Sequence, residues 1–185
     1  MKKLFWLSTL LLIACETVPT NHAAKPHDRR TPEIIASDKA IEQAAIEEFR
    51  DDADVQQQSH IAIDVYNGLA LITGEVLEPN LKSKIIDAVR IIPNVKMVRD
   101  SLDVAPLSTP EQHAADTELA RQVTEALKQI QTLPSFDSSM VKVVCEDGMV
   151  YLMGLVSKEE GEVVVKVTRL QPNVKQIVTV FEYVN

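Results

Sequence analysis

The chain has 185 residues, of which 45% are hydrophobic and 25% are charged, and its formal net charge is −8. This composition is typical of a folded protein and excludes disorder throughout the chain. The negative charge argues against general nucleic-acid binding, which needs a basic face to displace counterions. Two cysteines permit at most one disulfide, and five glycines leave few positions for left-handed turns.

The first residues predict a signal peptide over 1–14. Lys2 and Lys3 precede an uncharged apolar run at 4–14, which as a helix would be about 16 Å long, roughly half of a bilayer's hydrocarbon core. That length is typical of a signal peptide and too short for a membrane span. The run ends in Leu-Ile-Ala-Cys, which resembles the lipobox of bacterial lipoproteins. The pattern therefore favours lipidation of Cys15 over an ordinary secretory signal with a chance cysteine.

The mature chain would begin at the lipid-bearing Cys15, and loss of Lys2 and Lys3 would change its net charge to −10. Several acyl chains on one terminus anchor a protein stably in a membrane. Glu16 stands where an aspartate favours inner-membrane retention in enteric bacteria, so the outer membrane is the predicted location. Residues 15–36 contain three prolines and no apolar period, which predicts a lipidated N-terminus followed by a flexible tether.

The rest of the chain contains an internal repeat. Residues 61–76 align without gaps on 141–156 at an offset of 80, and Pro-Asn-Val-Lys recurs at 93–96 and 172–175. Four of the five glycines occupy equivalent positions and are predicted to serve structural turns: Gly68, Gly74, Gly148 and Gly154. Blocks that match in the same order indicate a duplication.

Each copy is predicted to contain a helix, a hairpin, a second helix and a final strand. The copies occupy residues 37–104 and 116–185, and a proline-containing linker at 105–115 is short enough to let them pack together. Asp38 and Asp116 each precede apolar residues at helical spacing, so they are predicted to be the N-caps of the first helices.

Local signals place the other elements. Asn67 with Gly68, and Asp147 with Gly148, are strong signals for type I′ hairpin turns, which need positive φ at both central residues. The second helix is predicted to begin near Pro79 in the first copy and at a capping box over 157–160 in the second. The β-branched run at 163–167 favours a strand by propensity, but the repeat and the capping box predict a helix.

Two such units behind a lipobox resemble the tandem BON domains (bacterial OsmY and nodulation) of outer-membrane lipoproteins. The likeness rests on the Asx-Gly hairpins, a second glycine six residues later and a Val-Lys strand start, and it is densest over 139–156. It implies an α+β fold of two αββαβ domains, each a small mixed three-stranded sheet packed on two helices. It also implies a non-enzymatic protein that faces the periplasm, binds anionic phospholipid such as phosphatidylglycerol or cardiolipin, and supports envelope integrity.

In that family the lipid contact lies mainly on the first helix of the second domain, here residues 116–131. The candidate lipid contacts are Thr117, Leu119, Arg121 and Lys128. Glu118 and Glu125 alternate with the two cations at a spacing typical of a solvated face with helical ion pairs, and the net negative charge repels anionic lipid. The alternative is an adaptor for the barrel-assembly machinery or the division site, with no direct headgroup binding.

The sequence contains no Gly-x-Ser-x-Gly, Walker or dinucleotide-binding motif, so we expect no enzyme and no cofactor. Cys145 lies on the apolar face of a strand and is predicted to be a small buried hydrophobe, not a nucleophile. The acidic residues at 51–54 lack the spacing and glycine of an EF-hand and are predicted to form a solvated loop. No metal site is predicted from the histidines, which have no partners in the sequence: His22, His27, His60 and His113.

Overall fold

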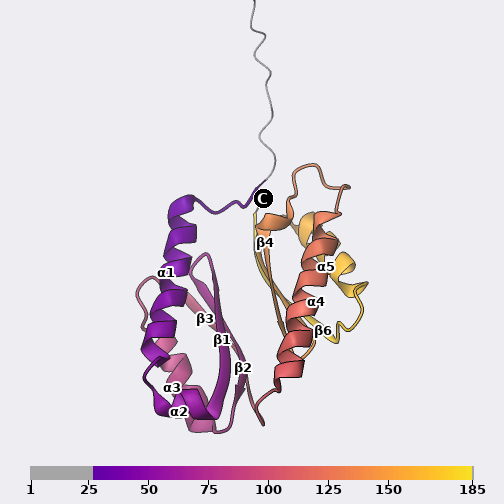
Figure 1. Cartoon of the computed structure of the whole chain (residues 1–185). Coiled ribbons are helices and arrows are strands. Elements are labelled where there is room, and N and C mark those ends of the chain that lie inside the picture. The colour runs from indigo at the N-terminus through magenta and orange to yellow at the C-terminus, as the bar shows by residue number, and fades with distance from the viewer. Residues whose placement is uncertain (1–26, 185) are drawn as a thin grey trace, which may run out of the picture.

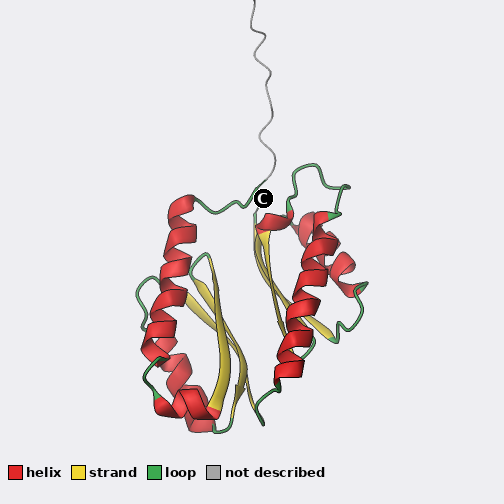
Figure 2. Ribbon diagram, viewed as in Figure 1, coloured by secondary structure: helices red, strands yellow, loops and turns green. Residues whose placement is uncertain are grey.

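The computed structural model describes residues 27–184 (Figures 1 and 2). The predicted signal peptide, Cys15 and His22 lie outside the described residues. Two αββαβ units follow one another along the chain, as the repeat predicts, and each has an α+β architecture. None of the helices in the described part combines the length and apolarity needed to cross a membrane.

The two units have the same topology. The first consists of α1 (Pro32–Phe49), α2 (Ala53–Gln58), β1 (Ser59–Tyr66), β2 (Leu69–Val76), α3 (Pro79–Arg90) and β3 (Met97–Val104). The second consists of α4 (Pro110–Lys128), the short 3₁₀ helix η1 (Ser138–Met140), β4 (Val141–Glu146), β5 (Met149–Val156), α5 (Lys158–Arg169) and β6 (Gln176–Tyr183). In each sheet the middle strand pairs antiparallel with its hairpin partner and parallel with the strand that follows the helical crossover.

The β-branched run at 163–167 lies within helix α5, as the repeat predicts. The helix begins with the predicted capping box, in which the Ser157 side chain accepts from the Glu160 backbone N–H and the Glu160 carboxylate accepts from that of Ser157. Val164 from this run is fully buried. Capping and core packing outweigh the strand propensity of the valines.

The first helix of each unit begins earlier than predicted, and the assignment of Asp38 and Asp116 as N-caps is wrong. Thr31 and Thr109 are the N-caps, and each precedes a proline at the first helical position. Threonine followed by proline is a recognised helix start, so the signal was present in the sequence. The C-terminal part of the predicted tether and of the predicted linker at 105–115 is therefore helical.

The two aspartates lie inside their helices and bind the hairpin turns. The Asp38 carboxylate accepts hydrogen bonds from the backbone N–H groups of Asn67 and Gly68 at 2.7 and 2.8 Å. Asp116 accepts the equivalent pair from the second turn, both at 2.9 Å. The first turn has the predicted positive φ at both central residues, 52° and 79°. A buried carboxylate thus satisfies turn N–H groups that have no strand partner.

Gly74 and Gly154 permit a close approach between the hairpin strands. A Cβ atom on Gly74, whose φ is +110°, would lie 2.0 Å from the His60 carbonyl oxygen. A Cβ atom on Gly154 would lie 2.7 Å from the Met140 carbonyl oxygen. The second glycine of each repeat is therefore required by backbone contact across the sheet.

The acidic segment at 51–54 is not wholly a loop, because it contains the start of α2, an element that was not predicted. Asp52 is the N-cap of this helix and accepts from the backbone N–H groups of Asp54 and Val55. Lys84 forms an ion pair with Asp52 at 2.5 Å, and Val55 is buried in the core. The capping aspartate and the buried Val55 both stabilise the short helix.

The molecule is built in four layers, helix–sheet–sheet–helix (Figure 2). Each sheet packs its helices on one face and the other sheet on its opposite face. Along β2, Ala70 and Ile72 belong to the core of the first unit, whereas Leu71 belongs to the core between the sheets. The central strands are therefore buried on both faces, which explains their nearly continuous apolar sequence.

Candidate functional site

The two units meet through an apolar contact between their sheets. Its buried residues are Tyr66, Leu71, Val144, Tyr151 and Met153, each no more than 9% exposed. A close-packed core of this kind holds the two units together. The prediction that the units could pack against each other is confirmed.

The repeat makes the two ends of this interface equivalent. At the offset of 80, Tyr66 corresponds to Glu146, and both residues precede a hairpin turn. The neighbours of Tyr66 across the interface, Met140 and Leu155, correspond to His60 and Glu75. These two regions are named the Tyr66 end and the Glu146 end below.

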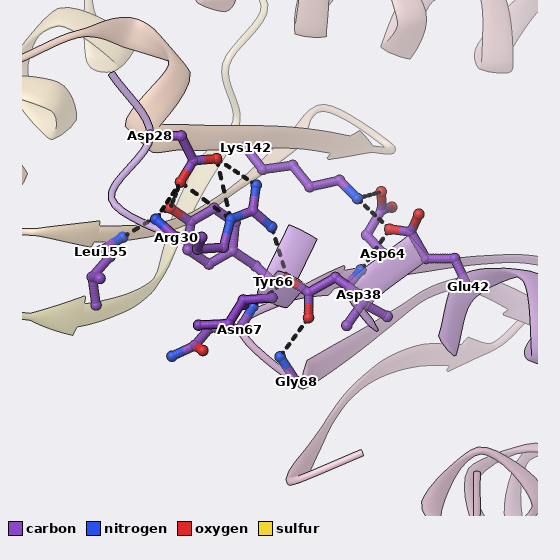
Figure 3. A network of polar contacts seen from close by, with 12 residues as sticks. Asp28, Arg30, Asp38, Glu42, Asp64, Tyr66, Asn67, Gly68, Lys142 and Leu155 are labelled. Carbon is purple, nitrogen blue, oxygen red and sulfur yellow. Dashed lines mark hydrogen bonds and ion pairs between the residues drawn. The ribbon is translucent and has the colours of Figure 1, made fainter. Parts of the chain in front are cut away.

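At the Tyr66 end, hydrogen bonds and ion pairs connect the Tyr66 hydroxyl with charged side chains from both units (Figure 3). The Tyr66 hydroxyl lies 3.0 Å from the Met140 carbonyl oxygen and 3.2 Å from an Asp28 carboxylate oxygen. It also accepts from the Leu155 backbone N–H at 3.4 Å. The guanidinium of Arg30 lies over the tyrosine ring, 3.7 Å from its centroid. Burial is the main reason why the pKa of Tyr66 rises to about 12.

Two arginines neutralise the carboxylates at the Tyr66 end. Arg30 forms ion pairs with Asp28 at 2.6 Å and with Asp38 at 2.8 Å. Arg29 forms a two-bond pair with Glu160, both contacts at 2.8 Å. Because Arg29, Arg30 and Asp28 precede α1, part of the predicted tether belongs to the folded structure.

Lys142 adds a second charged connection between the units. Its ammonium lies 2.6 Å from Glu42 and 2.8 Å from Asp64, so a strand of the second unit is joined to α1 and β1 of the first (Figure 3). Burial lowers the pKa of Lys142, but the two carboxylates outweigh it and the net shift is upward. The cation therefore stays charged at the interface.

At the Glu146 end, two carboxylates and an imidazole converge. One ligand atom each from His60, Glu75 and Glu146 lie within 4.8 Å of one another, and the two glutamates are only 7% and 8% exposed. Ser108 donates to Glu75 through its hydroxyl and its backbone N–H. Within residues 27–184, no hydrogen bond or ion pair reaches the Glu146 carboxylate. Burial, followed by repulsion from Glu75, raises the pKa of Glu146 to about 7.

His60 and His113, for which no partner was visible in the sequence, are stacked on each other. Their ring centroids lie 3.7 Å apart and the planes differ by 16°. The Nδ1 atom of His60 and the Nε2 atom of His113 are buried without a hydrogen-bond partner. Burial, assisted by His113, lowers the pKa of His60 and favours the neutral imidazole. Only the packing of two units reveals this cluster, because its members come from β1, β2, β4 and α4.

The outer face of α4 carries the predicted alternation of charges. Arg121 pairs with Glu118 at 2.6 Å and Lys128 pairs with Glu125 at 2.7 Å. All four side chains are about half exposed, between 49% and 62%. Hydrogen bonds from Arg121 and then Gln122 hold the pKa of Glu118 at about 2. The face is polar and accessible.

The other two candidate lipid contacts differ from these cations. Thr117 is exposed, and its hydroxyl donates to the His113 carbonyl oxygen one turn earlier in the helix. Leu119 is 4% exposed and packs with Val123 and Leu127 in the core of the second unit. Its place on the apolar stripe therefore removes Leu119 from the surface that could meet a headgroup.

Cys145 packs against the core of the second unit and is partly buried. Burial, together with Asp116 and Glu146, raises the pKa of its thiol to about 12. Because the thiolate is the reactive form of cysteine, this environment disfavours a role as a nucleophile.

Known proteins resemble the chain along both units. The BON domain family matches residues 37–106 and 115–185. The chain is 25% identical over 158 residues to the outer membrane lipoprotein DolP of Haemophilus influenzae, a match that covers 85% of this chain and 80% of that protein. Two solved structures of CdsD, a structural protein of the type III secretion system of Chlamydia trachomatis, match at 15% identity with a TM-score of 0.33. These matches cover 81% and 82% of this chain and 92% and 98% of those structures.

The family match covers both structural repeats and agrees with the αββαβ topology of each. The chain therefore belongs to the BON-domain family and carries two BON domains in tandem.

Proposed function

We propose that this protein is an outer-membrane lipoprotein, anchored through Cys15 on the periplasmic side, which binds anionic phospholipid through α4 and acts without catalysis. The observation that carries the proposal is the similarity to an outer membrane lipoprotein over 85% of the chain. The lipobox at 12–15 supports it independently, because it supplies a chemical means of attachment.

The placement of α4 is compatible with contact at a membrane surface. The described chain begins beside the C-terminal end of the second unit, and the C-terminal end of α4 lies toward the same end of the molecule (Figure 1). A lipid-anchored chain is held at high effective concentration next to its membrane, so weak headgroup contacts can be sufficient. The anchor and the helix would act together.

The ion pairs on α4 do not prevent headgroup binding. Exposed ion pairs such as that of Arg121 with Glu118 are weak because water screens them, so a phosphate can replace the glutamate. Each lysine or arginine close to an anionic surface contributes about 1 kcal/mol. The net charge of the chain opposes binding at long range, so we expect weak attachment that salt abolishes.

A second candidate function is that of an adaptor for another periplasmic protein, such as the barrel-assembly machinery. The observation that favours it is a pair of exposed aliphatic residues at equivalent places in the repeat. Ile91 follows α3 and is 82% exposed, and Leu170 follows α5 and is 81% exposed. Exposed apolar side chains in both units could contact a protein partner.

Vesicle binding separates the two functions. A chain that starts at residue 16 retains every described residue and can be mixed with vesicles of phosphatidylglycerol, of cardiolipin or of phosphatidylcholine alone. We expect binding only to the anionic vesicles, and NMR shifts concentrated on the exposed face of α4. No binding to anionic vesicles at low salt would contradict the phospholipid proposal and favour the adaptor.

A charge-reversal pair tests the site itself. Arg121→Glu with Lys128→Glu should weaken vesicle binding at least about thirtyfold, because two favourable contacts of about 1 kcal/mol each are lost. The matched control is Arg50→Glu with Arg90→Glu, since these arginines also form exposed ion pairs three residues apart and the change in net charge is the same. An equal loss in both variants would mean that total charge, not α4, governs binding.

A further inference from the structure

We propose that the Glu146 end is a zinc site that joins the two BON domains, with His60 and Glu75 from the first domain and Glu146 from the second as ligands. The site is independent of the proposed phospholipid contact. It rests on the convergence of ligand atoms, on the burial of the two glutamates and on the lack of a lysine or arginine paired with either glutamate within residues 27–184.

The first argument is the contrast with the equivalent place in the repeat. The carboxylates of the Tyr66 end are paired with Arg29 and Arg30. Among residues 27–184, no lysine or arginine is paired with Glu75 or Glu146, although both glutamates are more than nine-tenths buried. Buried carboxylates are normally paired or bound to a metal. A bound cation at the Glu146 end would neutralise these two carboxylates.

The second argument is the chemistry of the donors. The Nδ1 atom of His60 is buried without a hydrogen-bond partner, which leaves one imidazole nitrogen available, and the ring of His113 is stacked on that of His60. One imidazole and two carboxylates form a mixed nitrogen and oxygen set that suits zinc, with a fourth position left for water, whereas calcium and magnesium prefer oxygen ligands alone.

The third argument is distance. The His60 Nδ1 atom lies 3.8 Å from a Glu75 carboxylate oxygen, and the Glu146 carboxylate is within 4.8 Å of both residues. Zinc bonds of about 2.0–2.2 Å separate the ligand atoms of a tetrahedral site by roughly 3.4 Å. Side-chain rotations that move the ligand atoms by about 1 Å would bring them to this separation, because the strands that carry the ligands are already in place.

Support around the site is also present. Ser108 holds Glu75 through its hydroxyl and its backbone N–H, an outer contact of the kind that orients a ligating carboxylate. Ser108 lies in the segment between the two domains. The metal would therefore fix both the sheets and the segment that connects them.

The test is a calorimetric titration of zinc chloride into the metal-stripped, full-length lipidated chain in detergent. We expect one zinc per chain and an affinity that falls at least about tenfold in His60→Ala and in Glu146→Gln. The control variant, His22→Ala with His27→Ala, removes the other two histidines of the chain and should leave the affinity unchanged. Binding that survives His60→Ala and Glu146→Gln, or that disappears in the control, would overturn the assignment.

A second measurement does not depend on the folding of the variants. Cobalt(II) added to the unaltered, isotope-labelled chain should broaden the amide signals of residues 60, 75, 113 and 146 before those of any other segment. Broadening confined to other residues, or none at a cobalt excess, would overturn the proposal. Tight binding of calcium or magnesium in place of zinc would contradict the donor set.

Discussion

The Tyr66 end and the Glu146 end of the interface share a backbone arrangement and differ in how charge is balanced. At the Tyr66 end, arginines from the segment before α1 neutralise Asp28, Asp38 and Glu160. At the Glu146 end, the equivalent segment before α4 provides Ser108 in place of an arginine, and two glutamates remain close together. A duplicated fold has therefore kept its geometry while the chemistry of its two ends has diverged.

This difference indicates which end supplies structural stability and which is free to bind. A polar network in which every group is satisfied rigidifies an interface, whereas unpaired buried carboxylates cost free energy unless something neutralises them. The Tyr66 end therefore holds the two domains together, and the Glu146 end can respond to a cation. Each of the following substitutions either makes the charge balance of one end similar to that of the other or removes a structural feature of the ends.

The largest effect is expected from the second glycine of each repeat. Gly74→Ala should lower the free energy of unfolding by about 4 kcal/mol, because its Cβ would lie 2.0 Å from a carbonyl oxygen and its φ is +110°. Gly154→Ala should cost about half as much, since its Cβ would lie 2.7 Å from the equivalent carbonyl and its φ is not positive. Urea denaturation followed by circular dichroism measures both values. Equal losses of unfolding free energy in the two variants would contradict the expected difference in backbone strain between the two hairpins.

Arg30→Met should make the Tyr66 end electrostatically similar to the Glu146 end. Removing the guanidinium leaves Asp28 and Asp38 without their cation in a buried site, so we expect a loss of about 3 kcal/mol in the same denaturation assay. Arg50→Met is the matched control, because its exposed pair with Glu47 should be worth no more than about 0.5 kcal/mol. A loss no larger than that of the control would mean that Arg30 does not stabilise the interface.

Local sequence patterns predicted the fold but not the network between the domains. The hairpin turns at Gly68 and Gly148 follow from two adjacent residues, and the helix at 163–167 follows from a capping box and the repeat. The roles of Asp38 and Asp116 were mistaken, because an aspartate before an apolar stripe resembles an N-cap and its long-range bond to a turn leaves no local signal.

The candidate sites show the same limit. Leu119 was grouped with the surface cations although its spacing from Val123 and Leu127 already indicated a core position. His60 and His113 have nothing in common until β1 and α4 are brought together by the packing of the two sheets. A sequence pattern can identify each domain, but the side chains that meet across a domain interface depend on how the domains pack.

Tyr66→Phe tests the hydroxyl of the Tyr66 end alone. The ring and its contact with Arg30 remain, but the Leu155 N–H and the Met140 carbonyl lose their shared partner, so we expect a loss of about 1.5 kcal/mol. Tyr183→Phe is the control, because that tyrosine is 56% exposed and should change stability by less than about 0.5 kcal/mol. If the two variants unfold at the same urea concentration, the hydroxyl does not contribute to the interface.

The smallest predicted effect is a gain in stability, whereas the substitutions above all lower it. In the chelator EDTA at pH 8, Glu146→Gln should raise the free energy of unfolding by about 1 kcal/mol, because it removes one of two like charges that are buried together without a cation. Glu182→Gln is the matched control at the Tyr66 end, where Glu182 accepts a hydrogen bond from Asn67 at 2.8 Å, and it should produce no gain. With zinc in place of EDTA, the unaltered chain should be more stable than the Glu146→Gln variant, because only the unaltered chain keeps the complete set of zinc ligands. A loss of stability in EDTA would mean that Glu146 is already balanced, and the distinction between the two ends would fail.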